Sequence, residues 1–518
     1  MGYLFLTGAT GLLGSYLIRD LVRSGTPLAL LVRSTRLASA SHRVESLVGH
    51  WERQTGYALP RPVVLEGDLA RPDLGLDAAT RDWVARHCQA VMHNAASLTF
   101  HGEGPGTEPW RSNLDGTRNL LEFSRQAGLR EFHHVSTAYV CGLREDTARE
   151  SELDVGQSHG NDYEVSKFQA EQFVRAAEFI DDLTVYRPGI IFGDSQTGYT
   201  STFHGFYVPL KLVSTIISKV AATGMTGETL RASIQASSSR LREVLHLTGR
   251  ESKNFVPVDW VSAVMADVFT HREKHGTTYH LTPPKKVSLA MVQEVFEQAF
   301  LKSTKPVEQP NIEAIDWEEF ERFFLDGMST YRSYWRDDPE FDSTNTQRAC
   351  PHLPCPEMDA AMIARMCRYA IESNFGWPIK PIAAPEFDLH EHFRAMTPLG
   401  VSPDHETARP SSPSLNGRSL YLGLQVNGRG GGQWEIGVEN GRIATVRQGL
   451  SERCTATYYL NATTFERIAR QESTAARAVD SGRVLIEGNG VPVDQLARIL
   501  QSMAAAVLPP HAPPRQET

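Results

Sequence analysis

Three glycines at three-residue intervals constrain the fold of this chain more than any other feature. Gly8, Gly11 and Gly14 lie in the segment TGATGLLG, directly after the apolar run YLFL at 3–6 and at the start of a helical pattern. Glycines in this context allow a tight turn and let a pyrophosphate approach the amide groups at the helix N-terminus. The segment therefore predicts a dinucleotide-binding unit of strand, turn and helix. The residues of the turn expected to bind the cofactor are Gly8, Thr10, Gly11, Leu12, Leu13 and Gly14.

Residues 3–194 alternate short apolar runs with helical patterns. Compact apolar runs are typical of parallel strands that are covered on both faces. The alternation predicts an α/β protein with a Rossmann-type, doubly wound parallel sheet. The expected strands are 3–6, 28–32, 63–66, 90–94, 132–136 and 183–187, and the expected helices are 12–24, 78–87, 113–127 and 163–180.

Length, charge and cysteine usage exclude several classes of protein. At 518 residues the chain is too long for one core, and its net charge of -9 argues against general nucleic-acid binding. It has no apolar run long enough to span a membrane, and its first strand begins by Tyr3, which leaves no room for a signal peptide. We therefore expect a cytoplasmic protein whose six cysteines are free thiols. Cys350 and Cys355 flank His352 without a second ligand pair, so no metal site is predicted.

An arginine and a serine, Arg33 and Ser34, stand where the second strand ends. An acid there would bind the ribose hydroxyls and repel a 2′-phosphate, whereas a guanidinium pairs with phosphate. The sequence therefore favours NADPH over NADH, with the alternative that Arg33 stacks on adenine and serves either cofactor. Asp68 is expected to accept a hydrogen bond from the adenine amino group. The other residues expected to line the cofactor here are Leu69, Asn94, Ala95, Ala96 and Asn113.

A tyrosine and a lysine four residues apart, Tyr163 and Lys167, follow a strand that runs into Ser136 and Thr137. Residues at this spacing share one face of a helix. Such a pair alone is usually an ordinary helix surface, but here it follows the glycine turn and the hydroxyl-bearing strand in order. We expect Lys167 to lower the pKa of the Tyr163 phenol, which then donates a proton to a carbonyl group. The Thr137 hydroxyl, with Ser136 as second choice, would hold the developing oxyanion.

Seven motifs together resemble the extended short-chain dehydrogenases. They are TGATGLLG, EGDL, NAA, NLDGT at 113–117, VSTAYV at 135–140, YEVSK and YRPGIIFGD at 186–194. The chain is most similar to the fatty acyl reductase and thioester reductase branch, also called the male-sterility type. The resemblance covers about 1–265 and includes FVPVDWV at 255–261.

This resemblance implies specific roles for residues of both ends of the site. Thr137, Tyr163 and Lys167 would be the catalytic set, and Tyr163 and Lys167 would also contact the cofactor. The residues implied beside the nicotinamide are Pro188, Gly189 and Ile190. Two segments depart from the family pattern: the glycine-rich insertion HGEGPGTEP at 101–109, expected in a loop that faces the site, and residues 195–250.

A second domain is expected after the proline- and serine-rich segment 398–418. Strands at 419–426, 433–439, 442–447 and 454–460, followed by helices at 462–471, 474–480 and 492–506 and a strand at 483–487, predict an α+β domain. This part resembles sterol carrier protein domains in Trp434, the Asn440–Gly441 turn, TTFERIAR at 463–470 and AVDSGRVLIEGNG at 478–490. The resemblance implies an apolar tunnel for a lipid or acyl-CoA. A structural cap or a dimerisation domain is the alternative.

The expected domains are an NADP-binding short-chain dehydrogenase domain at 1–265, a mostly helical substrate-binding part at 266–397, a linker at 398–418, the carrier-like domain at 419–508 and a disordered tail at 509–518. The segment FYVPLKLVSTIISKV at 206–220 is expected to be a core-facing helix, and a lid in transient contact with a membrane surface is its alternative.

Three functions fit these features. The first is NADPH-dependent reduction of a lipophilic acyl thioester, carried by coenzyme A or an acyl carrier protein, to aldehyde or alcohol in lipid metabolism. The second is reduction of a ketone, or oxidation of a hydroxyl, on a sterol-like or secondary-metabolite substrate. The third, of another class, is a non-catalytic protein that binds NADP and lipid.

Overall fold

The computed structural model describes residues 2–212, 247–303, 317–376 and 420–507, apart from short gaps at 428–429, 440–441, 452 and 489–490, together with isolated positions such as 389 and 393. The chain divides into two compact units, one of residues 1–20 and 67–380 and the other of residues 21–66 and 381–518. The expected linker at 398–418 and tail at 509–518 lie outside the described residues.

A seven-stranded parallel sheet has the strand order β3-β2-β1-β4-β5-β6-β10. Its strands are β1 (Tyr3–Thr7), β2 (Leu28–Val32), β3 (Val63–Glu66), β4 (Cys88–His93), β5 (Glu131–Val135), β6 (Asp182–Pro188) and β10 (Thr278–Leu281). All residues of β1 and β2 are buried, as their continuous apolar sequences require. The strand order reverses between β1 and β4, so a ligand site is expected outside the carboxyl ends of these strands. The predicted Rossmann-type sheet is confirmed.

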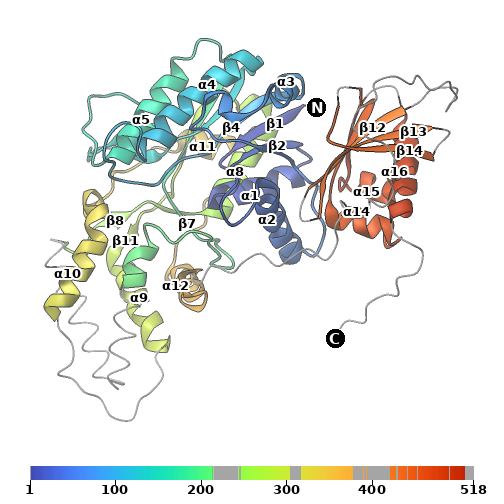
Figure 1. The fold of residues 1–518 in the computed structure, drawn as a ribbon. Helices are drawn as coiled ribbons and strands as arrows, with labels where there is room; N and C mark the ends of the chain where they lie inside the picture. The colour runs from blue at the N-terminus through green and yellow to red at the C-terminus, as the bar shows by residue number, and fades with distance from the viewer. Residues whose placement is uncertain are drawn as a thin grey trace. The chain divides into compact units, whose positions relative to one another are not determined.

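Helices cover both faces of this sheet (Figure 1). On one face lie α1 (Leu12–Arg23) and α8 (Val258–Thr270), which are joined by a 2.7 Å hydrogen bond from the Ser262 hydroxyl to Asp20. On the other lie α4 (Gly116–Ala127) and α5 (Asp162–Arg175). Helix α3 (Ala78–His87) also contacts α4. The arrangement is that of a doubly wound fold.

A helix that the sequence analysis omitted, α2 (Ala40–Thr55), lies between β2 and β3. Its buried side chains include Val44, Val48 and Trp51, which recur at the spacing of one helix face. The Ser39 hydroxyl caps its start, and Gly56 ends it with a φ of 74°. The periodic signal was therefore present, although charged and polar residues occupy most of the segment.

The later part of the first unit is mostly helical. Its helices are α9 (Leu289–Ser303), α10 (Trp317–Met328), α11 (Thr344–Ala349) and α12 (Ala360–Glu372). Two small sheets pair β7 (Ile190–Phe192) with β9 (Phe255–Pro257) and β8 (Ser252–Lys253) with β11 (Val287–Ser288). Phe206, Tyr207 and Leu210 are buried in the core of this region, as expected of a core-facing segment. Most of 213–220 lies outside the described residues.

The C-terminal region has a five-stranded sheet of order β14-β13-β12-β15-β16. Its elements are β12 (Leu420–Asn427), β13 (Gly432–Glu439), β14 (Arg442–Gln448), β15 (Ala456–Asn461), α14 (Ala462–Ala469), α15 (Ala475–Asp480), β16 (Leu485–Gly488) and α16 (Val493–Val507). The predicted α+β pattern is confirmed. Leu389 and Phe393 belong to its core, and the Phe393 ring centroid lies 4.8 Å from that of Trp434. Within the described ranges, no helix is long and apolar enough to cross a membrane.

Candidate active site

Close packing in the turn after β1 requires glycine at two of its positions. Gly8 has a φ of +69°, and a Cβ there would lie 2.5 Å from the Ala95 amide nitrogen. A Cβ at Gly14 would lie 2.1 Å from the Gly8 carbonyl oxygen. Gly11 differs, because its nearest neighbour would be 3.5 Å away. Gly8 and Gly14 therefore shape the turn. Gly11 is exposed beside the start of α1, where a pyrophosphate would lie, and its amide donates a 3.2 Å bond to the Gly8 carbonyl.

The segment after β4 packs on this turn at the reversal of strand order. The Asn94 side-chain amide donates a 3.2 Å hydrogen bond to the Gly8 carbonyl, and the Ala95 amide donates a 3.3 Å bond to the Thr7 hydroxyl. Ala95 and Ala96 keep the side chains here small. These predicted cofactor residues are thus brought together with the glycine turn.

Asn113, another predicted cofactor residue, bridges two parts of the site. It lies in the short π-helical segment η2 (Arg111–Asp115) and is buried. Its side-chain oxygen accepts a 2.7 Å bond from the Ser97 amide, and its side-chain nitrogen donates a 3.0 Å bond to the Ser166 hydroxyl. Asn113 therefore holds the loop after β4 against α5, which is a positioning role.

Two arginines lie together after β2. The Arg43 guanidinium donates a 2.5 Å hydrogen bond to the Arg33 carbonyl. Burial and then the positive charge of Arg33 lower the pKa of Arg43. The Ser34 hydroxyl accepts a 3.1 Å bond from the Ala40 amide and so orders the start of α2. Two neighbouring cations form a local environment that favours an anion.

Asp68 and Leu69 are held in a compact turn after β3. The Asp68 carboxylate accepts a 3.0 Å bond from the Ala70 amide, and the Leu69 carbonyl accepts a 2.7 Å bond from the Asn119 side chain. Both residues are half-buried. The contacts orient this turn relative to α4.

The predicted catalytic residues lie on β5 and α5. Ser136 and Thr137 follow the carboxyl end of β5 and are buried, while Tyr163 and Lys167 lie one turn apart on α5. Burial raises the pKa of Tyr163 to about 12, against the effect of a hydrogen bond with Thr137. The expected lowering of this pKa by Lys167 is therefore not found, because desolvation dominates. A phenol with this pKa is protonated at neutral pH, as a proton donor must be.

Lys167 is the buried cation of the site. Its ammonium donates a 2.7 Å hydrogen bond to the Val135 carbonyl. Burial lowers the pKa of Lys167 to about 8, and the Glu171 carboxylate opposes this shift. The neighbouring His93 has a pKa of about 3 because of burial and the charge of Lys167, so it stays neutral. The pKa of His134 is lowered by the same two causes.

At Gly189, directly after β6, the chain passes close to the backbone of Asn254. A Cβ there would lie 2.5 Å from the Asn254 carbonyl oxygen, which also accepts a 2.8 Å bond from the Ile190 amide. Pro188 ends β6 and is buried. Glycine is thus required at this turn, at the carboxyl edge of the sheet where Thr137 also lies.

The Phe100 ring packs against Tyr163 and against two further aromatic rings, none of which the sequence pattern predicted. The Phe100 ring centroid lies 5.5 Å from that of Tyr163, 5.1 Å from that of Tyr331 and 5.5 Å from that of Tyr334. Tyr331 and Tyr334 belong to η6 (Ser329–Tyr334), in the region expected to bind substrate. The Asn161 side chain, which caps α5, donates a 3.3 Å bond to the Tyr334 hydroxyl. These contacts create an aromatic environment beside the predicted acid.

The insertion at 101–109 is attached beside Tyr163. The Asp162 amide donates a 2.9 Å bond to the Phe100 carbonyl, and the Gly102 amide donates a 2.8 Å bond to the Asp162 carboxylate. Because Asp162 precedes Tyr163 at the start of α5, the loop is joined to the helix that bears the acid. This position agrees with the expectation that the loop faces the site.

The cysteines are free thiols, as expected. Cys350 and His352 meet at one carboxylate: the Cys350 thiol donates a 3.2 Å bond to Asp267, and His352 Nε2 lies 3.1 Å from it. Lys274 forms a 2.5 Å ion pair with the same carboxylate. The group is a hydrogen-bonded cluster around Asp267.

Comparison with characterised proteins gives partial matches. Aldehyde reductase lnaA of Aspergillus flavus is 27% identical over 413 residues, which cover 71% of this chain and 36% of that protein. Isonitrile lipopeptide synthase of Streptomyces coeruleorubidus is 34% identical over 204 residues, which cover 38% of this chain and 14% of that protein. The chain thus aligns with 36% or less of the length of these two relatives.

Solved structures share the fold. The terminal R domain from the myxalamid PKS-NRPS biosynthetic pathway aligns with a TM-score of 0.56 at 24% identity, covering 74% of this chain and 93% of that chain. A thiolation-reductase di-domain from an archaeal non-ribosomal peptide synthetase aligns with a TM-score of 0.51 at 17% identity, covering 72% of this chain and 76% of that chain.

The family match covers the part of the chain that carries the site. Residues 6–265, just over half of the chain, match the family described as male sterility protein. The match includes the glycine turn, the end of β5 and the whole of α5, which the structure brings to one edge of the sheet. This chain belongs to the male sterility protein family and is a nicotinamide-dependent oxidoreductase of the extended short-chain dehydrogenase type.

Proposed function

We propose that this chain uses NADPH to reduce a lipophilic acyl thioester, carried by coenzyme A or a carrier protein, to an aldehyde or alcohol. The observation that carries the proposal is the position of Tyr163: it is hydrogen-bonded to Thr137, packs against the Phe100 ring and shares α5 with Lys167. A reductase must place a proton donor where a carbonyl oxygen gains charge, and an apolar chain needs apolar walls beside it.

Tyr163 would donate its phenolic proton to the substrate carbonyl oxygen, and the Thr137 hydroxyl would donate a hydrogen bond to the same oxygen. Bound NADPH supplies a hydride for the carbonyl carbon. The Lys167 ammonium stabilises the phenolate that Tyr163 leaves behind. With a thioester, the product of these two transfers is a hemithioacetal. Its hydroxyl proton returns to the Tyr163 phenolate as the carbon–sulfur bond breaks, and the sulfur takes a proton from solvent and leaves as a free thiol, which yields the aldehyde.

The glycine turn fits a dinucleotide, because it is tight at Gly8 and Gly14 and carries no side chain at the exposed Gly11. Arg33, together with Arg43, supports NADPH rather than NADH, since paired guanidinium groups favour a 2′-phosphate. The pyrophosphate would be held by Gly11 and the start of α1.

The names of similar proteins support the thioester as substrate class. Two solved structures that share the fold are reductase domains of peptide and polyketide biosynthetic systems, and one of them includes a thiolation domain. A thiolation domain carries its substrate as a thioester. A carrier-bound substrate is therefore favoured for this chain.

A thiol-trapping dye tests the proposal. Purified protein is mixed with a long-chain acyl-CoA and NADPH, and both absorbance at the nicotinamide band and thiol release are followed. We expect one thiol for each aldehyde formed. Oxidation of NADPH with a ketone but without thiol release from any thioester would instead indicate the ketone reductase. Binding of NADPH without turnover on either substrate class would indicate the non-catalytic protein.

We infer that the C-terminal α+β domain is a lipid carrier. Side chains of its sheet and of helices α14–α16 form a common apolar core. Its sequence resembles sterol carrier protein domains. A carrier on the same chain raises the effective concentration of an insoluble substrate near the reductase. Its test is given below.

A further inference from the structure

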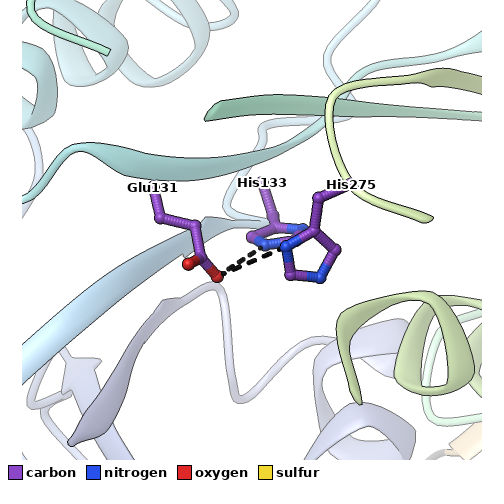
Figure 2. A group of neighbouring side chains, drawn as sticks. All are labelled: Glu131, His133 and His275. Atoms are coloured by element: carbon purple, nitrogen blue, oxygen red, sulfur yellow. Dashed lines mark hydrogen bonds and ion pairs between the residues drawn. The ribbon is translucent and has the colours of Figure 1, made fainter. Parts of the chain in front are cut away.

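Three side chains of types that commonly bind metals lie together at the amino ends of the strands of the seven-stranded sheet (Figure 2). The catalytic residues lie at the opposite, carboxyl ends. Glu131 begins β5, and His133 lies two residues later on the same face of that strand. His275 lies just before β10, after the short helix η4 (Arg272–Lys274). Thr137 and Gly189, by contrast, follow the carboxyl ends of β5 and β6.

The donor atoms are spaced as ligands of one ion. His133 Nε2 lies 3.3 Å from Glu131 Oε1, and His275 Nδ1 lies 3.7 Å from the same oxygen. All three donor atoms lie within 4.8 Å of one another. Tetrahedral zinc, with bonds of about 2.1 Å, places its ligand atoms about 3.4 Å apart. Small movements of the side chains would bring the three donors to that geometry.

One ring nitrogen of His275 has no hydrogen-bond partner among the described residues. Its Nε2 lies 3.1 Å and 3.0 Å from the carbonyl oxygens of Val268 and Phe269, which only accept hydrogen bonds, so Nε2 carries a hydrogen. Its Nδ1 has no hydrogen-bond partner in the described ranges, although the side chain is only 2% exposed. Nδ1 is therefore the nitrogen that can bind an ion beside Glu131.

A second carboxylate lies beside the same nitrogen. Asp182 Oδ2 lies 3.8 Å from His275 Nδ1, and Asp182 Oδ1 also has no hydrogen-bond partner in the described part of the chain. Two carboxylates beside one nitrogen favour a cation at this place. Both oxygens lie beyond hydrogen-bonding distance of Nδ1, so no direct hydrogen bond joins them to it. Arg272 lies 3.6 Å from the other Glu131 oxygen, but its side chain is 84% exposed.

The remaining nitrogens have the partners that metal-binding histidines need. His133 Nδ1 lies 3.1 Å from the Tyr186 hydroxyl, which can accept its hydrogen when Nε2 binds an ion. His275 donates Nε2–H to backbone carbonyls. Such outer contacts orient the rings of metal ligands and select the tautomer. Both histidines are therefore set to present a lone pair to the same point.

We propose that Glu131, His133 and His275 bind a divalent cation of the zinc type. Two imidazoles and a carboxylate are a donor set that suits Zn²⁺. The ion would join the amino end of β5 to the segment before β10, and the nearby Asp182 carboxylate would add negative charge beside it. Its role is structural, since the catalytic residues lie at the other edge.

Metal titration of the full chain tests this assignment. Protein stripped with a chelator is titrated with Zn²⁺ by calorimetry, and Co²⁺ is added separately to record the visible bands of a tetrahedral site. We expect one tight equivalent. Glu131→Gln and His275→Gln should each weaken Zn²⁺ binding by at least about a hundredfold, and Tyr186→Phe by about tenfold.

A matched control removes a nearby exposed histidine. His271→Gln changes a side chain that is 47% exposed and lies four residues from His275, and it should leave Zn²⁺ binding unchanged. Circular dichroism confirms that each variant is folded, and Glu131→Gln keeps the size of the side chain if His275→Gln does not fold. Absence of Zn²⁺ binding by the stripped protein, or equal binding by folded Glu131→Gln, would overturn the proposal.

Discussion

The Lys167 ammonium donates a 2.7 Å hydrogen bond to the carbonyl of Val135, the last residue of β5. This contact joins the helix that bears Tyr163 to the strand that leads into Thr137. The lysine is buried beside the end of β5, and its charge is therefore sensitive to the low polarity around it.

The pH profile should reveal this burial. Because the pKa of Lys167 is lowered to about 8, the ammonium loses its charge as pH rises through about 8. With a substrate that does not titrate, kcat/KM should fall through that range, since it reports ionisations of the free enzyme. NADPH affinity, measured over the same series, separates loss of cofactor from loss of catalysis. A profile that stays flat well above pH 8 would contradict the prediction.

Tyr163→Phe should reduce turnover by at least about a hundredfold, which is the usual scale for a positioned general acid. The ring and its packing against Phe100 are retained, so NADPH affinity should change little. Tyr57→Phe, at a ring that is 43% exposed, is the control for loss of a hydroxyl. Steady-state rates and fluorescence titration of NADPH provide the two readouts, and near-normal turnover of the variant would refute the assignment.

Arg33→Ala should weaken NADPH binding by about 2 kcal/mol, or about thirtyfold, as expected for loss of a charge-assisted hydrogen bond. NADH binding should be largely spared, because it lacks the 2′-phosphate. Arg53→Ala, at an exposed arginine of α2, is the matched control. If both cofactors lose affinity equally, Arg33 does not bind the phosphate.

The glycine turn offers a paired test of packing and binding. Gly14→Ala would place a methyl group 2.1 Å from the Gly8 carbonyl, so it should lower the melting temperature and abolish NADPH binding. Gly11→Ala meets its nearest atom at 3.5 Å, so the protein should fold normally. It should nevertheless bind NADPH more weakly, because the methyl group blocks the pyrophosphate. Unchanged affinity in folded Gly11→Ala would show that the pyrophosphate does not approach there.

The proposal that the C-terminal domain carries lipid should be tested with a fragment that begins before the expected linker. Leu389 and Phe393 belong to its core, although they precede the expected linker at 398–418. A fragment of residues 381–508 should therefore bind a fluorescent fatty acid without nucleotide, and a fragment of residues 415–508 should be less stable to heat. If the longer fragment is folded but binds neither fatty acid nor acyl-CoA, the domain is structural.

The sheet and the cofactor turn could be predicted because their signals are local. β1 and β2 are short apolar runs, and Gly8 and Gly14 meet within one turn. The aromatic environment of Tyr163 could not be predicted, because Phe100 and Tyr331 are far apart in the sequence and meet only in the folded protein. The same holds for His275, which reaches Glu131 and His133 because β10 pairs with β6 beside β5. Within the group of Glu131, His133 and His275, the two-residue spacing of Glu131 and His133 on β5 is the part visible in the local sequence.

The contacts of Phe100 have a consequence for making chimeras of this enzyme. Its ring lies against Tyr163 of the catalytic helix and against Tyr331 and Tyr334 of the helical region. Transplanting residues 317–376 from a relative would bring in new partners for a ring encoded more than two hundred positions earlier. We therefore expect a chimera to take over the relative's substrate preference only when the segment around Phe100 and residues 317–376 are transferred together. If residues 317–376 are transferred alone, Phe100 would pack poorly against them beside Tyr163.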